Sequence, residues 1–458
     1  MEYALNGGLI NTDAIDNSAG VDCSDHEVNI KILLNACVQR GELTIEARNE
    51  LLASMTDEVG ELVLDDNRAQ TIALTIARRQ ALSMVNVHTR YLHALEADGW
   101  LNRSLEFLPT DRQLAERQAN GQALTAPEFA VLLAYTKNAN VAEIGQSDVP
   151  DNAYLEADLV RYFPTAMRER YHAEICGHQL RREIISTQVI NQMVNLSGIS
   201  FDHRMTEQVG ASLADIVRAW VVARDVTRLP QLWEEIEQLE GDVKLDVRLE
   251  LLLEARRMTE RGVMWFLRHR RPPIDIAATV GEFSEAVEHL AGQFADVLRG
   301  QLGALTHSTW ASRLAAGVPD ALAERSAVWP VLHTAFDVIE VARRQGADHV
   351  VAARCYWELF DTLDVLWLWD GIGGLPRSTR WETQARSALR DDLLSGLSDL
   401  TEEVLRSGAD VPSWLATNER AVGRVTTMFN EVRRSDTFDL TTLTVGVRQL
   451  RNLALATQ

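Results

Sequence analysis

Hydrophobic residues recur every three or four positions along most of the chain after residue 41, which is the spacing of amphipathic helices. Short loops, several of them containing proline, separate the periodic stretches. No repeat of fixed period is found, so a regular solenoid is not expected. The pattern predicts a helix that begins at Thr125 and further helices over residues 44–54, 65–98, 177–197, 243–270, 281–301, 319–345, 349–369, 378–407 and 413–433.

The first 24 residues differ from the rest because small and polar side chains dominate and no helical period is present. They are typical of strand, loop and turn. Ser24 and Glu27 have the spacing of a capping box, which predicts a helix from there to a glycine stop at Gly41. The fold class expected is therefore mostly α, with a small α/β remnant followed by a large irregular helical domain. The domains expected are residues 1–41, 42–228 and 229–458.

Candidate chemistry is concentrated in residues 17–24. Asn17 offers hydrogen-bond donors and acceptors on a short stem, and the small residues after it let the main chain approach a ligand closely. Val21 supplies an apolar wall, and Ser24 would lie at a helix N-terminus, where free N–H groups favour an anion. The group suits a small carboxylate beside a flat ring. The alternative is that Ser24 only caps its helix and Asn17 only braces a turn.

Composition narrows the possible partners. The 458 residues carry a net charge of −21, which argues against nucleic acid and anionic membranes as partners. The four cysteines are scattered without metal-ligand spacing, so no metal site is predicted. No apolar run has membrane length and no N-terminal signal is present, which favours the cytoplasm. A glycine-rich stretch over residues 371–376 departs from the dinucleotide-binding pattern and is expected to be a loop.

Two segments resemble glutamate dehydrogenases. In that superfamily the coenzyme-binding domain ends with the pattern Asp-x-x-x-Asn-Ala-Gly-Gly-Val-x-x-Ser, and the matching residues here are Asp13, Asn17, Gly20, Val21 and Ser24. The departures, Ser18 and Ala19, are similar to the large NAD-specific bacterial class. Residues 124–135 resemble the C-terminal helical region of the same class, and the two segments occur in the expected order.

The resemblance implies that residues 1–41 are the end of a Rossmann-like coenzyme-binding domain. It implies that Val21 and Ser24 contact glutamate, that Asn17 lies beside the nicotinamide of NAD, and that Asp13 only supports the loop. The family's catalytic lysine and aspartate and its phosphate-binding turn lie upstream of this motif, so no catalytic residue is expected in this chain.

The expected function is therefore that of the C-terminal portion of an NAD-dependent glutamate dehydrogenase. The complete enzyme would convert L-glutamate, NAD and water into 2-oxoglutarate, ammonia and NADH, and would be a homo-oligomer. The chain alone would be inactive. The alternative function is a free-standing helical scaffold or regulatory module without catalysis.

Overall fold

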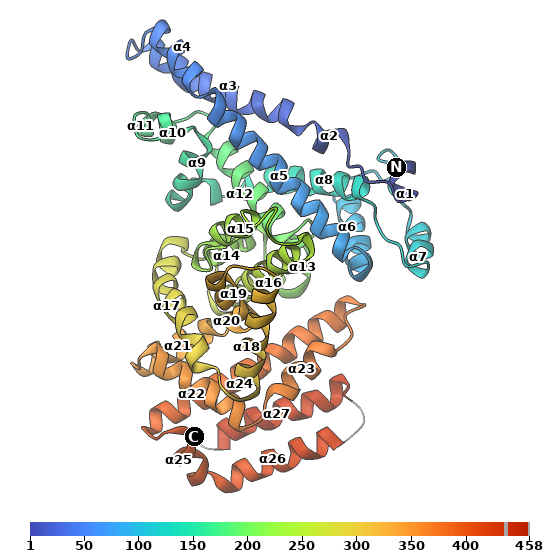
Figure 1. Cartoon of the computed structure of the whole chain (residues 1–458), viewed down its shortest axis with the longest axis vertical. Coiled ribbons are helices and arrows are strands. Elements are labelled where there is room, and N and C mark those ends of the chain that lie inside the picture. Colours follow the sequence, from blue (N-terminus) through green and yellow to red (C-terminus); the bar gives the residue numbers. More distant parts are fainter. Residues whose placement is uncertain (435–437, 457–458) are drawn as a thin grey trace. The chain divides into compact units, whose positions relative to one another are not determined.

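The computed structural model describes residues 1–434 and 438–456, and these residues are helical with no strand (Figure 1). Two compact units are present. Unit 1 comprises Met1–Thr206 and Gly210–Arg218, and unit 2 comprises Glu207–Val209 and the chain from Ala219 onward. Within the described ranges, none of the helices combines the length and apolar character that crossing a membrane requires.

Unit 1 is built from helices of very different lengths. Its elements are α1 (Glu2–Leu5), α2 (Asp13–Asp16), α3 (Ser18–Gln39), α4 (Ile45–Ser54), α5 (Thr56–Gln80), η1 (Leu82–Met84), α6 (Val85–Ala97), α7 (Asp111–Ala119), α8 (Ala126–Ile144), η2 (Val149–Asp151), η3 (Ala153–Leu155), α9 (Glu156–Tyr162), α10 (Thr165–Arg168), α11 (His172–Cys176) and α12 (Arg181–Ser197). Helices α13 (Phe201–Val209) and α14 (Leu213–Val226) span the division between the units.

Unit 2 contains the remaining helices. They are α15 (Leu229–Glu237), α16 (Leu245–His269), α17 (Ile276–Val297), α18 (Gly300–Ala315), α19 (Asp320–Ala327), α20 (Trp329–Leu332), α21 (Ala335–Gln345), α22 (His349–Thr362), α23 (Leu366–Gly374), α24 (Arg380–Ser407), α25 (Val411–Thr417), α26 (Glu419–Arg434) and α27 (Leu440–Ala456).

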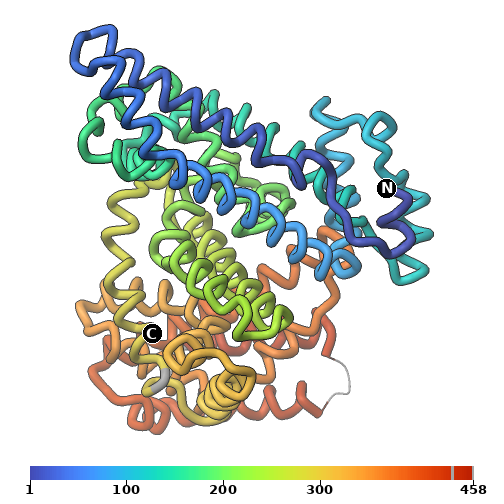
Figure 2. Tube along the Cα trace, turned by 45° about the horizontal axis from the view of Figure 1, so that its top comes forward, coloured from blue at the N-terminus to red at the C-terminus, as the bar shows by residue number. Residues whose placement is uncertain are grey.

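Long helices that run side by side form the core of unit 1. Helices α3 and α5 lie along one another, and α12 packs against α5, α8 and α9 (Figure 2). The face of α12 that makes these contacts is apolar, with Ile185, Val189 and Met193 at most 1% exposed. Burial of this face stabilises unit 1 by roughly 25 cal/mol per Å² of apolar surface removed from water.

An aromatic cluster forms part of the core of unit 2. Trp265 and Phe266 of α16 contact Phe283 of α17 and Phe336 of α21, with ring centroids 5.0 to 5.8 Å apart. Edge-on and tilted arrangements of this kind are the favourable geometry for aromatic pairs. In the same unit α24 packs along α27 (Figure 1).

The predicted α/β remnant at the N-terminus is wrong for the described residues. Residues 2–5, 13–16 and 18–24 lie in α1, α2 and the first turns of α3, and residues 6–12 are turn and irregular chain without a strand. Leu9 and Ile10, the residues most typical of a strand there, are 73% and 47% exposed and have no strand to pair with. Because an isolated strand leaves its backbone groups unpaired, it has no stabilising partner in this part of the chain.

The predicted capping box at Ser24 is also wrong. Helix α3 begins at Ser18, so Ser24 lies two turns inside it, and Glu27 forms an ion pair with Lys31 one turn later.

The glycine-rich stretch expected to be a loop is likewise helical as far as Gly374, since it belongs to α23. The predicted helical domain is confirmed, whereas the boundaries expected at residues 41 and 228 stay predictions.

Candidate functional site

The three predicted binding residues lie on one exposed stripe of α3. Asn17 is its N-cap residue and makes no side-chain capping hydrogen bond, while Val21 and Ser24 follow at spacings of four and three residues. Residues separated in this way share one face of a helix. All three are exposed, Val21 to 77%. The stripe is therefore available to a ligand or to another part of a protein.

The start of α3 is held in place by α5. The Asn67 side-chain amide donates hydrogen bonds of 2.7 Å to the Ile15 carbonyl oxygen and of 2.7 Å to the Ser18 hydroxyl. Ile15 itself is only 2% exposed. The hydroxyl of Ser18 is thus directed to α5. Opposite it Gly20 has space, because a Cβ added there would meet only the Asn17 side chain, at 3.6 Å.

Because α3 begins earlier than predicted, a carboxylate would bind at a different position on this helix. Free backbone N–H groups belong to the first turn of a helix, which here begins at Ser18, although the Gly20 N–H already donates to the Asn17 carbonyl oxygen at 3.3 Å. Ser24 was expected at that position, but its backbone N–H falls within the hydrogen-bonded part of α3. Ser24 can therefore contact a ligand only through its hydroxyl, and the positive end of the helix lies nearer to Asn17.

A polar network lies beside the stripe, on the flank of α3 that contacts α9. The Tyr162 hydroxyl of α9 donates to Asp25, at 2.8 Å, and accepts from the Asn29 amide, at 2.8 Å. The backbone oxygen of Asn29 lies 3.1 Å from His178 Nε2. The Tyr162 pKa is raised, chiefly by burial, so the hydroxyl stays protonated. These bonds fix the rotation of α3 about its axis and so determine which residues face outward.

His26 lies in the same interface. Its ring stacks on Tyr162 with centroids 4.3 Å apart, and only 2% of the residue is exposed. Burial lowers the pKa of His26 from its ordinary value, although Asp25 acts against this, so the ring is neutral at neutral pH.

A lysine and two carboxylates on α3, α5 and α8 are close enough to shift one another's pKa. Burial raises the pKa of Asp22 to about 7, and repulsion from Asp66 and Asp25 adds to the effect. The pKa of Asp66 is raised as well, chiefly by burial. Burial lowers the pKa of the Lys137 amine to about 8, while Asp66 and Asp22 act in the opposite direction. Lys137 thus supplies positive charge near two half-buried carboxylates.

Sequence reasoning missed this cluster. In the sequence Lys137 is more than 100 residues from Asp22, and no local pattern connects α8 to α3. The one available signal was the spacing of four residues between Asp22 and His26, which places both on one face of a helix. The ligand atoms of Asp22, His26 and Asp66 also lie within 4.8 Å of one another, although no metal site was predicted.

A cleft of about 890 Å³ lies elsewhere in unit 1 and contains none of the predicted site residues. Its charged groups are paired: Arg103 with Asp111 at 2.7 Å, and Arg117 with Glu128 at 2.8 Å. Since these charges already neutralise one another, the cleft shows no group poised for catalysis. Its lining comprises Met1, Leu5, His93, Glu96, Asn102, Arg103, Ser104, Phe107, Leu108, Pro109, Thr110, Asp111, Arg112, Gln113, Arg117 and Glu128.

Comparison with known proteins relates these features to a family. The family described as "Glutamate dehydrogenase, C-terminal" matches residues 121–452, which is most of the chain. The chain belongs to this family. The family described as "Bacterial NAD-glutamate dehydrogenase, catalytic domain" matches residues 1–77. The predicted resemblance to the large NAD-specific bacterial class is thereby confirmed.

Three individual relatives are named NAD-specific glutamate dehydrogenase. A protein named NAD-specific glutamate dehydrogenase from Pseudomonas aeruginosa is 40% identical over 465 residues, covering 100% of this chain and 29% of that protein. Proteins of that name from Mycobacterium tuberculosis and Halomonas elongata are 37% and 38% identical over 99% of this chain and 28% of their own length. The chain therefore spans less than a third of the relatives it matches.

Both matched segments of this glutamate dehydrogenase family member contribute residues to the cluster of Asp22, Asp66 and Lys137. Asp22 and Asp66 belong to the segment similar to the catalytic domain, and Lys137 belongs to the segment that matches the C-terminal family. The exposed stripe of Asn17, Val21 and Ser24 lies entirely in the segment similar to the catalytic domain.

Proposed function

We propose that this chain functions as part of an NAD-dependent glutamate dehydrogenase, which converts L-glutamate, NAD and water into 2-oxoglutarate, ammonia and NADH. The observation that carries the proposal is identity of 37–40% to proteins of that name along 99–100% of the chain. In this proposal the exposed stripe of α3 forms one edge of the active site, and the helical mass behind it keeps that edge in position.

Each residue of the stripe has a role that suits its chemistry. The Ser24 hydroxyl donates to the side-chain carboxylate of glutamate, and Val21 packs against the methylene groups of the substrate. The amide of Asn17 binds the carboxamide end of NAD, for which it offers both a donor and an acceptor. When bound, NAD accepts the hydride from the substrate. The chain's own contribution is to bind and orient the two reactants, which lowers the entropic part of the barrier.

NAD fits this chain only at its nicotinamide end. Asn17 is exposed and makes no capping hydrogen bond, so its amide is open to a ligand. A glycine-rich turn for the pyrophosphate is not found in the sequence, because the stretch at residues 371–376 departs from the pattern and is largely helical. We therefore propose that the chain alone does not oxidise glutamate. The predicted homo-oligomeric assembly and cytoplasmic location stay predictions.

A chimera tests the proposal. The aligned region of the Pseudomonas aeruginosa relative is replaced by this chain, and NADH formation from glutamate is measured. We expect activity from the chimera and none from the 458-residue chain alone. Turnover by the chain alone would contradict the division of roles. A folded but inactive chimera would favour the helical scaffold without catalysis.

The substitution Ser24→Ala in the chimera tests the residue assignment. Loss of one hydrogen bond to a carboxylate costs about 1.5 to 3 kcal/mol, so the KM for glutamate should rise at least about tenfold. The KM for NAD should stay unchanged. Ser312→Ala, which removes a hydroxyl from an exposed position of α18, is the matched control and should change neither constant. Equal rises in both KM values for Ser24→Ala would count against a glutamate contact.

A further inference from the structure

Three groups of side chains in unit 1 have the composition of a metal site. Within each group the potential ligand atoms lie within 4.8 Å of one another. The groups differ in the positively charged side chains near them. A nearby arginine or lysine disfavours binding of a metal ion.

Two of the groups contain a positively charged side chain. Among Cys37, Glu42 and Glu174, the Arg40 guanidinium lies 2.7 Å from Glu42, 3.6 Å from Glu174 and 3.5 Å from the Cys37 sulfur. Among Asp22, His26 and Asp66, Lys137 supplies the positive charge. A divalent cation would be repelled by the arginine or lysine at either place.

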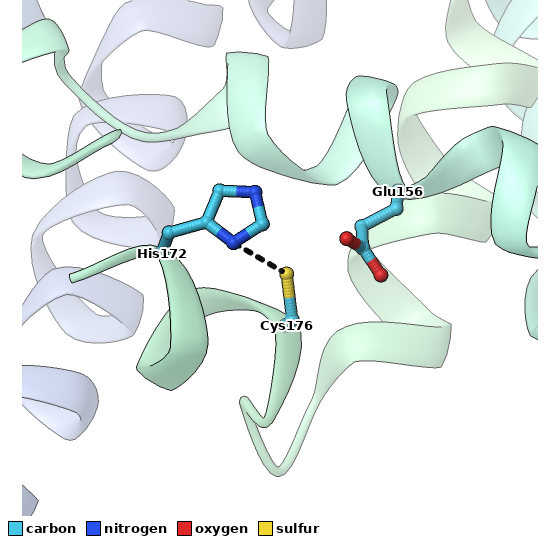
Figure 3. A group of neighbouring side chains, drawn as sticks. All are labelled: Glu156, His172 and Cys176. Atoms are coloured by element: carbon cyan, nitrogen blue, oxygen red, sulfur yellow. Dashed lines mark hydrogen bonds between the residues drawn. The ribbon is translucent and has the colours of Figure 1, made fainter. Parts of the chain in front are cut away.

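The third group, Glu156, His172 and Cys176, has a positively charged neighbour with only a weak effect. Glu156 is the first residue of α9, and His172 and Cys176 are four residues apart on α11. Figure 3 shows the imidazole and the Glu156 carboxylate directed to the thiol from different sides. In the described part of the chain, Glu156 forms no ion pair with lysine or arginine. The positive charge that acts on the thiol is Arg181, and its effect on the pKa is weaker than that of Glu156.

The spacing of these atoms matches a tetrahedral zinc site. The Cys176 sulfur lies 3.6 Å from His172 Nδ1. With a Zn–S bond of about 2.3 Å and a Zn–N bond of about 2.0 to 2.1 Å, a tetrahedral angle separates sulfur and nitrogen by about 3.6 Å. Sulfur, imidazole nitrogen and carboxylate oxygen are also the donor atoms that zinc accepts in proteins.

We propose that Glu156, His172 and Cys176 bind one zinc ion, with water in the fourth coordination position. The ion connects α9 to α11, two short helices at the edge of unit 1. Because His172 is exposed, the site is accessible to metal ions in solution.

Metal binding has to release a proton. Burial and the Glu156 carboxylate raise the pKa of the Cys176 thiol to about 11, so the metal-free side chain is protonated at neutral pH. On binding, the S–H bond breaks, the sulfur donates its electron pair to zinc, and the proton passes to solvent. Affinity therefore increases with pH.

Cobalt(II) provides a direct test, because it replaces zinc in such sites and a thiolate ligand gives it a charge-transfer absorption. The complete chain is titrated with Co²⁺. We expect this absorption to saturate at one ion per chain and to disappear when Zn²⁺ is added. Absence of the absorption in the metal-loaded protein would overturn the proposal.

Substitutions identify the ligands. Cys176→Ser should abolish the charge-transfer absorption, whereas Cys23→Ser, which alters an exposed thiol on α3, should retain it. Glu156→Gln and His172→Ala should each weaken Zn²⁺ binding at least about tenfold, since even loss of an outer partner costs that much. Far-UV circular dichroism verifies that each variant is folded, and Glu156→Gln keeps the shape of the side chain. An unchanged absorption in Cys176→Ser, or its loss in Cys23→Ser, would refute the assignment.

Discussion

Asp22 lies on the buried side of α3, next to the exposed Val21, and its ionisation opposes folding. Its pKa is about 7 in the folded chain against an ordinary value of 3.8, because burial and the nearby Asp66 disfavour the charged form. Between these two values the unfolded chain has lost the proton that the folded chain keeps. The contribution of Asp22 to stability therefore falls as the pH rises from about 4 to about 7. Lys137 reduces this penalty without removing it.

The substitution Asp22→Asn should remove this pH dependence. Asparagine is uncharged throughout, so the variant should be more stable than the parent chain at pH 8, by an amount on the order of 4 kcal/mol, which corresponds to the rise of the Asp22 pKa from 3.8 to about 7. At pH 4 the difference should be small. Urea unfolding of both proteins at the two pH values measures the effect. Asp13→Asn, at an exposed carboxylate, is the control and should not change the slope. A variant with the parent's pH dependence would show that Asp22 does not titrate near pH 7.

At the level of single elements, the same sequence signal succeeded at one helix and failed at another. At α8 the predicted start is confirmed, since Glu128 accepts hydrogen bonds from the Thr125 backbone N–H at 2.7 Å and from its hydroxyl at 2.8 Å. Ser24 and Glu27 have the same spacing but lie inside α3. A local pattern cannot tell whether the preceding residues are helical as well. Burial of Ile15 and the bonds from Asn67 decide that, and both depend on packing against α5.

Glu128 does more than cap its helix, and the substitution Glu128→Ala tests this. The carboxylate is 1% exposed and pairs with Arg117 at 2.8 Å. Its removal leaves a largely buried guanidinium without its partner, so we expect a loss of about 3 to 5 kcal/mol in the free energy of unfolding. Gln113→Ala is the matched control, because Gln113 caps α7 in the same way at an exposed position. It should cost about 1 kcal/mol. Urea unfolding measures both losses of free energy. Equal losses in the two variants would show that the buried ion pair contributes nothing to stability beyond the helix cap.

Helix α23 shows a second limit of prediction from sequence. Its glycines favour a loop, yet residues up to Gly374 are helical. Packing explains the difference, because a Cβ at Gly371 would lie 2.8 Å from Leu443 and one at Gly446 would lie 2.7 Å from Leu368. The glycines thus permit α23 and α27 to approach closely. This contact joins segments about 70 residues apart, and no local pattern reveals it.

For the molecule as a whole, the family and the helical architecture were accessible from the sequence, whereas the buried chemistry was not. Two short motifs sufficed to identify the glutamate dehydrogenase family, and the helical period predicted the long helices. Asn17, Val21 and Ser24 were chosen by resemblance, and their shared exposed face became visible only once α3 was known to begin at Ser18. The clusters around Lys137 and Cys176 depend on tertiary packing that brings separate helices together.

Each of the two units has its own buried core, and this predicts that they unfold separately. Phe163 in unit 1 and Phe266 in unit 2 are both 0% exposed. Replacing either by alanine should destabilise its own unit by about 3 to 5 kcal/mol. Trp100 is the one tryptophan of unit 1, so the other ten of the chain's 11 tryptophans report on unit 2.

Urea unfolding is therefore followed by tryptophan fluorescence and by far-UV circular dichroism. In Phe163→Ala we expect the fluorescence midpoint to stay within error of the parent chain, while part of the circular dichroism change moves to lower urea concentration. In Phe266→Ala the fluorescence midpoint itself should fall. If instead both variants shift a single transition that the two probes report together, the units form one cooperative structure, because only then does the loss of one core lower the stability of the other.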